Sequence, residues 1–322
     1  MRFLFFGLLA LGLSTGALAL PRPAAAQMVS QETGGRAEDH NARILAATQR
    51  MSVILAETLG NPAIQGAQTP EALAAAVEAI APKVRSHREE LSAINRELAI
   101  LPRVGDSGEV AMLSAIDQTV DATASLALKL ETLLADLETI PGAVRDRDQA
   151  RFLAAARSLT SGQILVAEYQ ALSARDKARF FVNSPFQHAQ LTAMACFFDG
   201  QAVLLSRING LADRDTSTAA LAGPAECIRD AANRGRVALA DGAAQVDGPE
   251  AAIRAQATPI NNEIFDTLLE AADLLSATAG MLDRDEPTAA ILSHFNSRQT
   301  ELLTTIQQLS ARLDEIVAQA NR

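Results

Sequence analysis

Apolar residues recur at alternating steps of three and four over long stretches of this chain. This spacing is the period of an α-helix that is buried along one side. Helices with such stripes pack nearly antiparallel, with knobs-into-holes contacts. Alternation at every second residue, which is typical of a half-buried strand, is missing. The sequence therefore predicts an all-α fold, an antiparallel bundle of long helices. The stripes that carry this prediction cover residues 73–101, 113–137, 191–208, 260–282 and 302–320.

An internal echo predicts two tandem helical modules, residues 36–143 and 144–322, because Arg43-Ile-Leu-Ala-Ala returns as Arg151-Phe-Leu-Ala-Ala. A chance resemblance between alanine-rich helices is the alternative. The tripeptide Asp-Arg-Asp also recurs, at 146–148, 213–215 and 283–285. It lacks the alternating acids, central Gly and closing Glu of an EF-hand calcium loop. We expect its second Asp to cap the following helix instead.

The chain begins with Arg2, an apolar run over residues 3–20 and a small-residue stretch that ends at Ala26. A positive start, a hydrophobic middle and an Ala-x-Ala end are typical of a secretory signal peptide. We therefore expect residues 1–26 to be removed on export and residues 27–35 to form a flexible N-terminus. An uncleaved membrane anchor is the alternative, because the run is close to the ~18 residues that can span a bilayer.

The charge balance narrows the partners of the exported chain. Removing residues 1–26 takes away two arginines and no acid, so the formal net charge falls from −10 to −12. Nucleic acids and anionic membranes need a basic surface, and an acidic chain is a poor partner for both. Arg far outnumbers Lys and Ala is abundant, as in GC-rich bacterial genomes, which makes the periplasm the expected location.

Two cysteines remain in the mature chain, Cys196 and Cys227. In an oxidising compartment an even number of cysteines favours a disulfide. A metal or redox pair is the alternative, but C-x-x-C spacing and a nearby His are both lacking. We expect a structural bridge between Cys196 and Cys227.

No nucleophile elbow, H-E-x-x-H, phosphate loop, dinucleotide fingerprint or haem attachment motif occurs in the chain. His40, His188 and His294 have no second ligand at helical spacing, so no metal site assembles locally. We expect no catalysis and no cofactor, and an enzyme with a site built from distant residues is the least favoured class. His87 differs, since it lies within an apolar stripe with Glu90 one turn on. It is either a buried histidine paired with a polar neighbour or a pocket-lining group that responds to pH.

The segment Asn41-Ala-Arg-Ile-Leu-Ala-Ala-Thr-Gln-Arg-Met-Ser52 invites a comparison with sensing domains. It resembles the start of the N-terminal domain of type IV pilus methyl-accepting chemotaxis transducers, and it is similar to the periplasmic domain of nitrate/nitrite sensor kinases. Those families open a helix with Asn-x-Ala-Gly-Arg-Gln-Arg-Met-Leu-Ser-Gln-Arg, which Asn41, Gln49, Arg50 and Met51 match. Ile54-Leu55 replaces the later Gln-Arg. The resemblance implies an all-helical sensing domain.

In the nitrate-sensing relatives the arginine of this motif meets a small anion, and the resemblance gives that position to Arg50. A guanidinium flanked by apolar residues is also a fair anion donor in its own right, because it presents a fixed fork of N–H groups. A surface arginine without a ligand is the alternative. The candidate ligand-binding residues are Arg43, Gln49, Arg50 and His87.

We therefore expect a non-enzymatic periplasmic sensing or binding module that recognises a small polar or anionic ligand or a partner protein. The chain has no kinase or methylation segment, so it would pass its signal to a membrane receptor or another envelope protein. The kinase relatives bind across a dimer, which by analogy predicts a homodimer. A structural or chaperone-like helical protein is the second class, because alanine-rich helices with few aromatic residues suit it.

Overall fold

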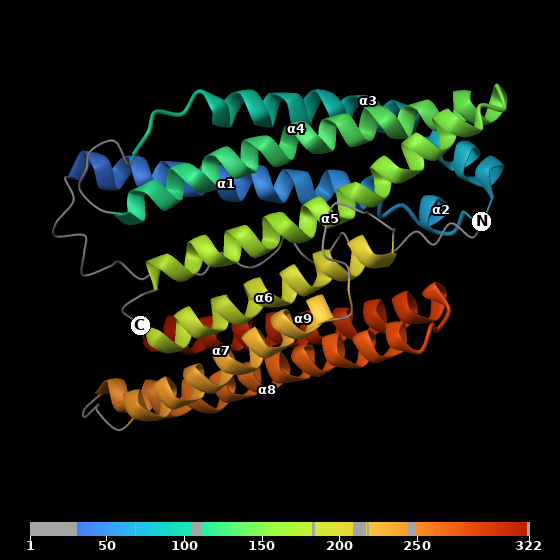
Figure 1. The fold of residues 1–322 in the computed structure, drawn as a ribbon. Coiled ribbons are helices and arrows are strands. Elements are labelled where there is room, and N and C mark those ends of the chain that lie inside the picture. The colour runs from blue at the N-terminus through green and yellow to red at the C-terminus, as the bar shows by residue number, and fades with distance from the viewer. Residues whose placement is uncertain are drawn as a thin grey trace. The chain divides into compact units, whose positions relative to one another are not determined.

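The computed structural model describes residues 31–67, 69–104, 111–181, 184–208, 217, 219–243 and 249–320. Long helices make up most of this part of the chain, and no strand occurs in it (Figure 1). The predicted all-α helical bundle is therefore confirmed. The predicted signal peptide, residues 1–26, lies outside the described ranges.

The chain divides into two compact units, residues 1–169 and 170–322. The first unit holds α1 (Gln31–Glu57), α2 (Pro62–Gln65), α3 (Pro70–Ala99), α4 (Ala111–Arg145) and the first part of α5 (Gln149–Phe180). The second unit holds the rest of α5 with α6 (Pro185–Ile208), α7 (Ala219–Ala243), α8 (Pro249–Asp283) and α9 (Thr288–Ala320).

We predicted the division after residue 143, at the turn that precedes α5, but it lies inside that helix. The reason is that α5 contributes side chains to two separate cores. Phe152 and Leu159 are buried in the core of the first unit, and Ala171 is buried in that of the second. A turn in the sequence therefore marks the end of a helix here without marking the end of a folded unit.

In the first unit α3 and α4 pair most closely, and α1 packs against both. The inward face of α1 carries Met51, Ile54 and Leu55, each at most 1% exposed. Burying an aliphatic side chain of this size contributes about 1.5–3 kcal/mol, so this face holds α1 on the unit. A proline inside a helix favours a kink or a break, but Pro82 lies inside α3, which continues past it to Ala99.

In the second unit α6 pairs with α7, α7 with α8, and α8 with α9. Three fully buried phenylalanines, Phe198, Phe265 and Phe295, fill its centre, and the ring of Phe295 stacks on Phe197 at 6.2 Å between centroids. Pro259 lies within α8, which likewise continues to Asp283.

A ladder of ion pairs runs along both sides of α8. The acidic residues of α8 pair alternately with arginines of α7 and of α9. Asp266 and Asp273 pair with Arg236 and Arg229 of α7, and Glu263 and Glu270 pair with Arg312 and Arg298 of α9. Within each set the α8 acids stand seven residues apart, which is two helical turns. Each exposed pair contributes little stability, about 0–1 kcal/mol, but the set matches only one register of the three helices.

The helix ends test two further expectations. Asp148 accepts a hydrogen bond from the Arg151 backbone N–H at 2.9 Å and so caps α5 as predicted. In the copy at 283–285, Asp285 has a left-handed backbone conformation (φ 51°) and lies in the turn that follows α8. It therefore does not cap α9 as Asp148 caps α5. Residues 31–35, predicted to be flexible, are the first turn of α1. Once a helix is nucleated, each further residue adds a hydrogen bond at small cost, so α1 extends beyond its packed segment.

Candidate functional site

Arg50 lies between two carboxylates of α3. Its Nε donates to Glu90 Oε1 at 2.9 Å, and its Nη1 donates to Glu97 Oε2 at 3.0 Å. The Arg50 side chain is 36% exposed, so it is neither a core residue nor a free surface group. The hydrogen bond to Glu90 is the main reason that the pKa of Arg50 is raised above its usual value, with burial opposing the shift and Glu97 adding to it.

His87 lies one step further along the same interface. Its Nε2 is 3.1 Å from Glu57 Oε2 of α1, and its Nδ1 is 3.7 Å from Glu90 Oε2 on its own helix. The side chain is 13% exposed, and it pairs with a polar neighbour as the first of the two interpretations of His87 requires. Lys83 pairs with Glu57 at 3.2 Å. The hydrogen bond from His87, followed by that from Lys83, holds the pKa of Glu57 below its usual value.

These contacts form one continuous line of charge, which we call the α1–α3 seam. It carries two permanent cations and three carboxylates, so its net charge is −1 when the histidine is neutral. The seam consists of Arg50, Glu57, Lys83, His87, Glu90 and Glu97.

The register of the seam follows from the buried faces of the two helices. Arg50 and Glu57 border the apolar face of α1 and stand seven residues apart, so both point to the same neighbour. Arg50, the earlier residue on α1, pairs with Glu90 and Glu97 of α3. Glu57, the later residue on α1, pairs with Lys83 and His87, which come earlier on α3. The two helices are therefore antiparallel, and opposite charges meet at each step.

Two of the predicted site residues do not join the seam. Arg43 is exposed and pairs with Asp39, one turn earlier on α1, at 2.8 Å. Gln49 is exposed, and within the described ranges it makes no hydrogen bond with a residue of the seam. Sequence reasoning missed Lys83 and Glu97. Complementary charges repeating at one-turn and two-turn intervals on both helices were the signal for them, but their use requires knowing that α1 and α3 are neighbours.

A second polar feature lies where α1 meets the end of α3. His40 is 2% exposed, and its Nε2 donates to the Pro102 carbonyl at 2.7 Å. Nearby, Asp117 accepts the Val104 backbone N–H at 3.0 Å. These groups border a cleft of about 30 Å³, which has room for an occupant the size of a water molecule. Its size is too small for an organic ligand.

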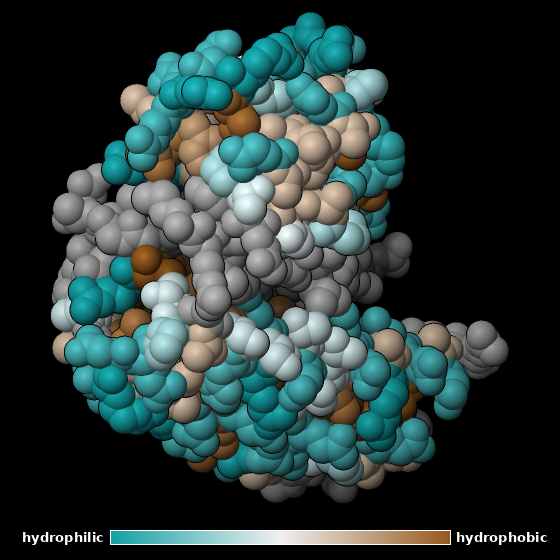
Figure 2. Space-filling view, turned by 90° about the vertical axis from the view of Figure 1, so that its right-hand side faces the viewer, coloured by the Kyte–Doolittle hydropathy of each residue, from teal (hydrophilic) through white to brown (hydrophobic). Residues whose placement is uncertain are grey.

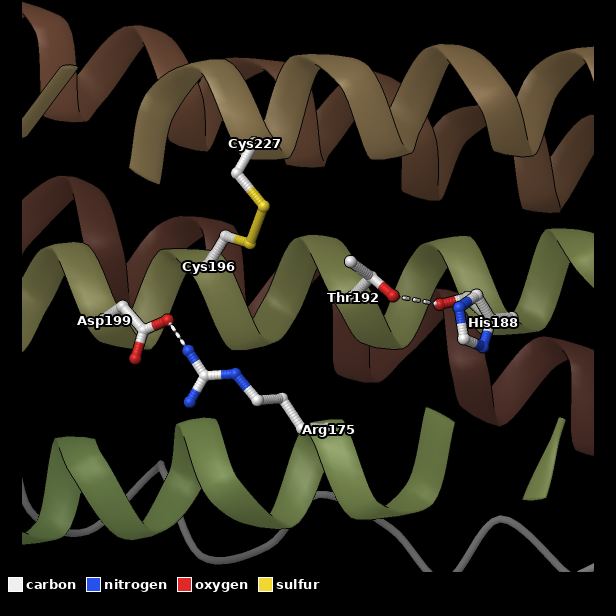
Figure 3. Close-up of a disulfide and its surroundings, with 6 residues drawn as sticks. All are labelled: Arg175, His188, Thr192, Cys196, Asp199 and Cys227. Atoms are coloured by element: carbon white, nitrogen blue, oxygen red, sulfur yellow. Dashed lines mark hydrogen bonds and ion pairs between the residues drawn. A yellow bond between two sulfur atoms is a disulfide. The ribbon is translucent and has the colours of Figure 1, made fainter. Parts of the chain in front are cut away.

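Cys196 of α6 and Cys227 of α7 form the predicted disulfide (Figure 3). The same view shows Arg175 of α5 reaching Asp199 of α6, and the Thr192 hydroxyl donating to the His188 carbonyl at 2.8 Å. The bridge links two helices that already pack closely. No group of His, Cys, Asp and Glu that could hold a metal ion occurs in the described part of the chain.

The large apolar side chains that are exposed within the described ranges are Val53, Ile100, Leu128, Leu172 and Val237. On the face shown in Figure 2, the most hydrophobic residues (brown) appear in small spots, and moderately hydrophobic residues (tan) form a broader area in the upper part of the view. By length and composition α6 could cross a membrane, but 67% of its most apolar window is buried inside the protein, as in a core helix.

No known protein family, curated protein or solved structure matches this chain.

Proposed function

We propose that this chain is a non-enzymatic binding module, exported to the periplasm, which senses a small anionic or polar ligand at the α1–α3 seam. One observation carries the proposal. Arg50, the residue that the resemblance to sensing domains singles out, links α1 to two carboxylates of α3 and is still accessible to solvent.

The contacts of Arg50 allow an exchange of partners. Exposed ion pairs contribute only about 0–1 kcal/mol each, so a ligand that binds the guanidinium through two charge-assisted hydrogen bonds can replace a glutamate. Releasing a glutamate changes how α1 is held against α3. A small shift of one helix along another is an established way to convert occupancy into a signal.

The expected location and partner follow from separate features. A disulfide between Cys196 and Cys227 is stable in an oxidising compartment, in agreement with export by the predicted signal peptide. We propose that a membrane receptor or another envelope protein reads the position of α1. A structural or chaperone-like role is the alternative, because alanine-rich helices with few aromatic residues suit it.

The proposal is tested by titrating the mature protein with nitrate, sulfate, phosphate and acetate in a thermal shift assay. At least one anion should stabilise the wild type and fail to stabilise Arg50→Ala. The matched control is Arg145→Ala, which removes another exposed arginine that pairs with α3, through Glu78, outside the seam. It should respond like the wild type. Stabilisation by no anion would contradict an anionic ligand, and an equal response in Arg50→Ala would contradict the role of Arg50.

Tyrosine fluorescence provides a second readout. Tyr169 is the sole tyrosine and the chain has no tryptophan, so the signal comes from one position. Its hydroxyl lies 2.9 Å from Thr123 Oγ1 of α4 and 3.4 Å from Thr48 Oγ1 of α1. Thr48 stands two residues before Arg50, so a shift of α1 should change the environment of the ring. A ligand that binds and leaves this fluorescence unchanged would contradict the helix shift.

A further inference from the structure

Of the two ion pairs that Arg50 makes, the pair with Glu97 is the more accessible to a ligand. The side chain of Glu97 is 56% exposed, against 35% for Glu90. Within the described ranges Glu97 pairs with Arg50 alone, whereas Glu90 also approaches His87 at 3.7 Å. Of the two carboxylates that hold Arg50, Glu97 is therefore the one whose release costs less free energy.

A simple anion that displaces Glu97 leaves the Glu97 carboxylate without a cation. The seam then goes from a net charge of −1 to −2 with the histidine neutral. Like charges a few ångströms apart repel by about 1 kcal/mol in water and by more near a protein surface. The anion therefore has to overcome the repulsion of the group that it releases.

We infer that the ligand of the seam is a small zwitterion, an amino-acid-like molecule that carries a carboxylate and an ammonium group close together. Its carboxylate replaces Glu97 on the Arg50 guanidinium, and its ammonium group pairs with the released Glu97. The net charge of the seam stays at −1, and each ion pair that is broken is replaced by a new one. This inference rests on the proposed function and adds the class of ligand to it.

The geometry sets the size of such a ligand. Arg50 Nη1 and Glu97 Oε2 lie 3.0 Å apart before the exchange, so a molecule of a few atoms can reach both after a small separation of the side chains. Both side chains are long and partly exposed, which makes that separation cheap. A planar carboxylate also matches the fork of donors on a guanidinium better than a spherical ion does.

The test is calorimetric titration of the mature protein with glycine, N-acetylglycine and glycinamide. The three molecules share a backbone but carry both charges, only the anion and only the cation, respectively. Glycine should bind at least about tenfold more tightly than either relative, which corresponds to about 1.4 kcal/mol. Arg50→Ala should abolish glycine binding. Glu97→Gln should remove the difference between glycine and N-acetylglycine, because no carboxylate is left for the ammonium group.

The control variant is Glu78→Gln, which neutralises an exposed glutamate of the same helix that pairs with Arg145. It should keep the wild-type preference for glycine. If N-acetylglycine or glycinamide binds the wild type as tightly as glycine, the zwitterion is wrong. Glycine binding that survives Arg50→Ala would also overturn it. If none of the three binds but an inorganic anion still stabilises through Arg50, only the zwitterion fails. If neither kind of ligand binds, the proposed function fails as well.

Discussion

Gly235 of α7 lies where the ring of Phe265 approaches the helix backbone. A Cβ atom at this position would stand 2.1 Å from Phe265 Cζ and 2.3 Å from Cε1, where ordinary contacts are about 3.5–4.0 Å. Phe265 is fully buried in the core of the second unit, so its ring has no free space to enter. We therefore predict that Gly235→Ala destabilises the protein, although Ala is the better helix former.

The expected change in the free energy of unfolding is the difference between two contributions. Replacing Gly by Ala inside a helix stabilises by about 1 kcal/mol. Overpacking a filled core costs about 1–3 kcal/mol, and a contact this short belongs at the upper end. The expected net loss is about 2 kcal/mol. For a unit of this size that lowers the unfolding temperature by about 4–8 °C. Thermal unfolding followed by circular dichroism in the helix band, with the disulfide intact, measures it.

Gly280 of α8 provides the matched control in the same unit. A Cβ there would meet only the mobile end of Arg284, at 3.4 Å, so Gly280→Ala should raise stability by about 0.5–1 kcal/mol. Phe265→Leu provides a second check. Combined with Gly235→Ala, it should cost less than the sum of the two single changes by about 1 kcal/mol, because the smaller side chain leaves room for the methyl group. If Gly235→Ala were as stable as Gly280→Ala, the close approach would be refuted.

Three further predictions concern covalent and charged contacts. Replacing Cys196 and Cys227 by Ala, which opens a loop of 31 residues, should lower the free energy of unfolding in denaturant by about 3–4 kcal/mol. Because its pKa is depressed in the folded state by the His and Lys beside it, the Glu57 carboxylate stabilises the fold above its ordinary pKa of 4.5. That contribution is lost as the pH falls through the lowered value, so Glu57→Gln should weaken the decline of stability in acid, measured as melting temperature against pH. Arg229→Asp or Asp273→Arg alone should each lower stability by up to about 1 kcal/mol, and the double exchange should restore it.

The sequence is sufficient to predict the fold class because the helical period is a local property. Stripes such as residues 73–101 repeat over many turns, and nothing in the chain competes with them. The disulfide is predictable for a similar reason, since two cysteines allow a single pairing. The division between the units is not predictable in this way. It depends on which core each turn of α5 enters, and the residue types at Leu159 and Ala171 do not say which core receives them.

The candidate site is predictable only in part. Arg50 and His87 stand out by themselves, one through a motif and the other through its place in an apolar stripe. Their partners do not, because Lys83 and Glu97 look like ordinary exposed charges of a helix until α3 is placed antiparallel to α1. The Asp285 turn differs from the Asp148 cap for a comparable reason. The same three residues meet different following residues, and the backbone ends the helix differently.

The seam can respond to a ligand without unfolding the unit, because two contributions of different size hold α1 in place. The buried side chains Met51, Ile54 and Leu55 together contribute several kcal/mol, at about 1.5–3 kcal/mol each. The ion pairs of Arg50 contribute about 0–1 kcal/mol each. A ligand with a millimolar dissociation constant releases about 4 kcal/mol at the standard state, which exceeds the ion pairs and falls short of the apolar face. Binding should therefore shift the polar edge of α1 slightly relative to α3, while its apolar face stays packed.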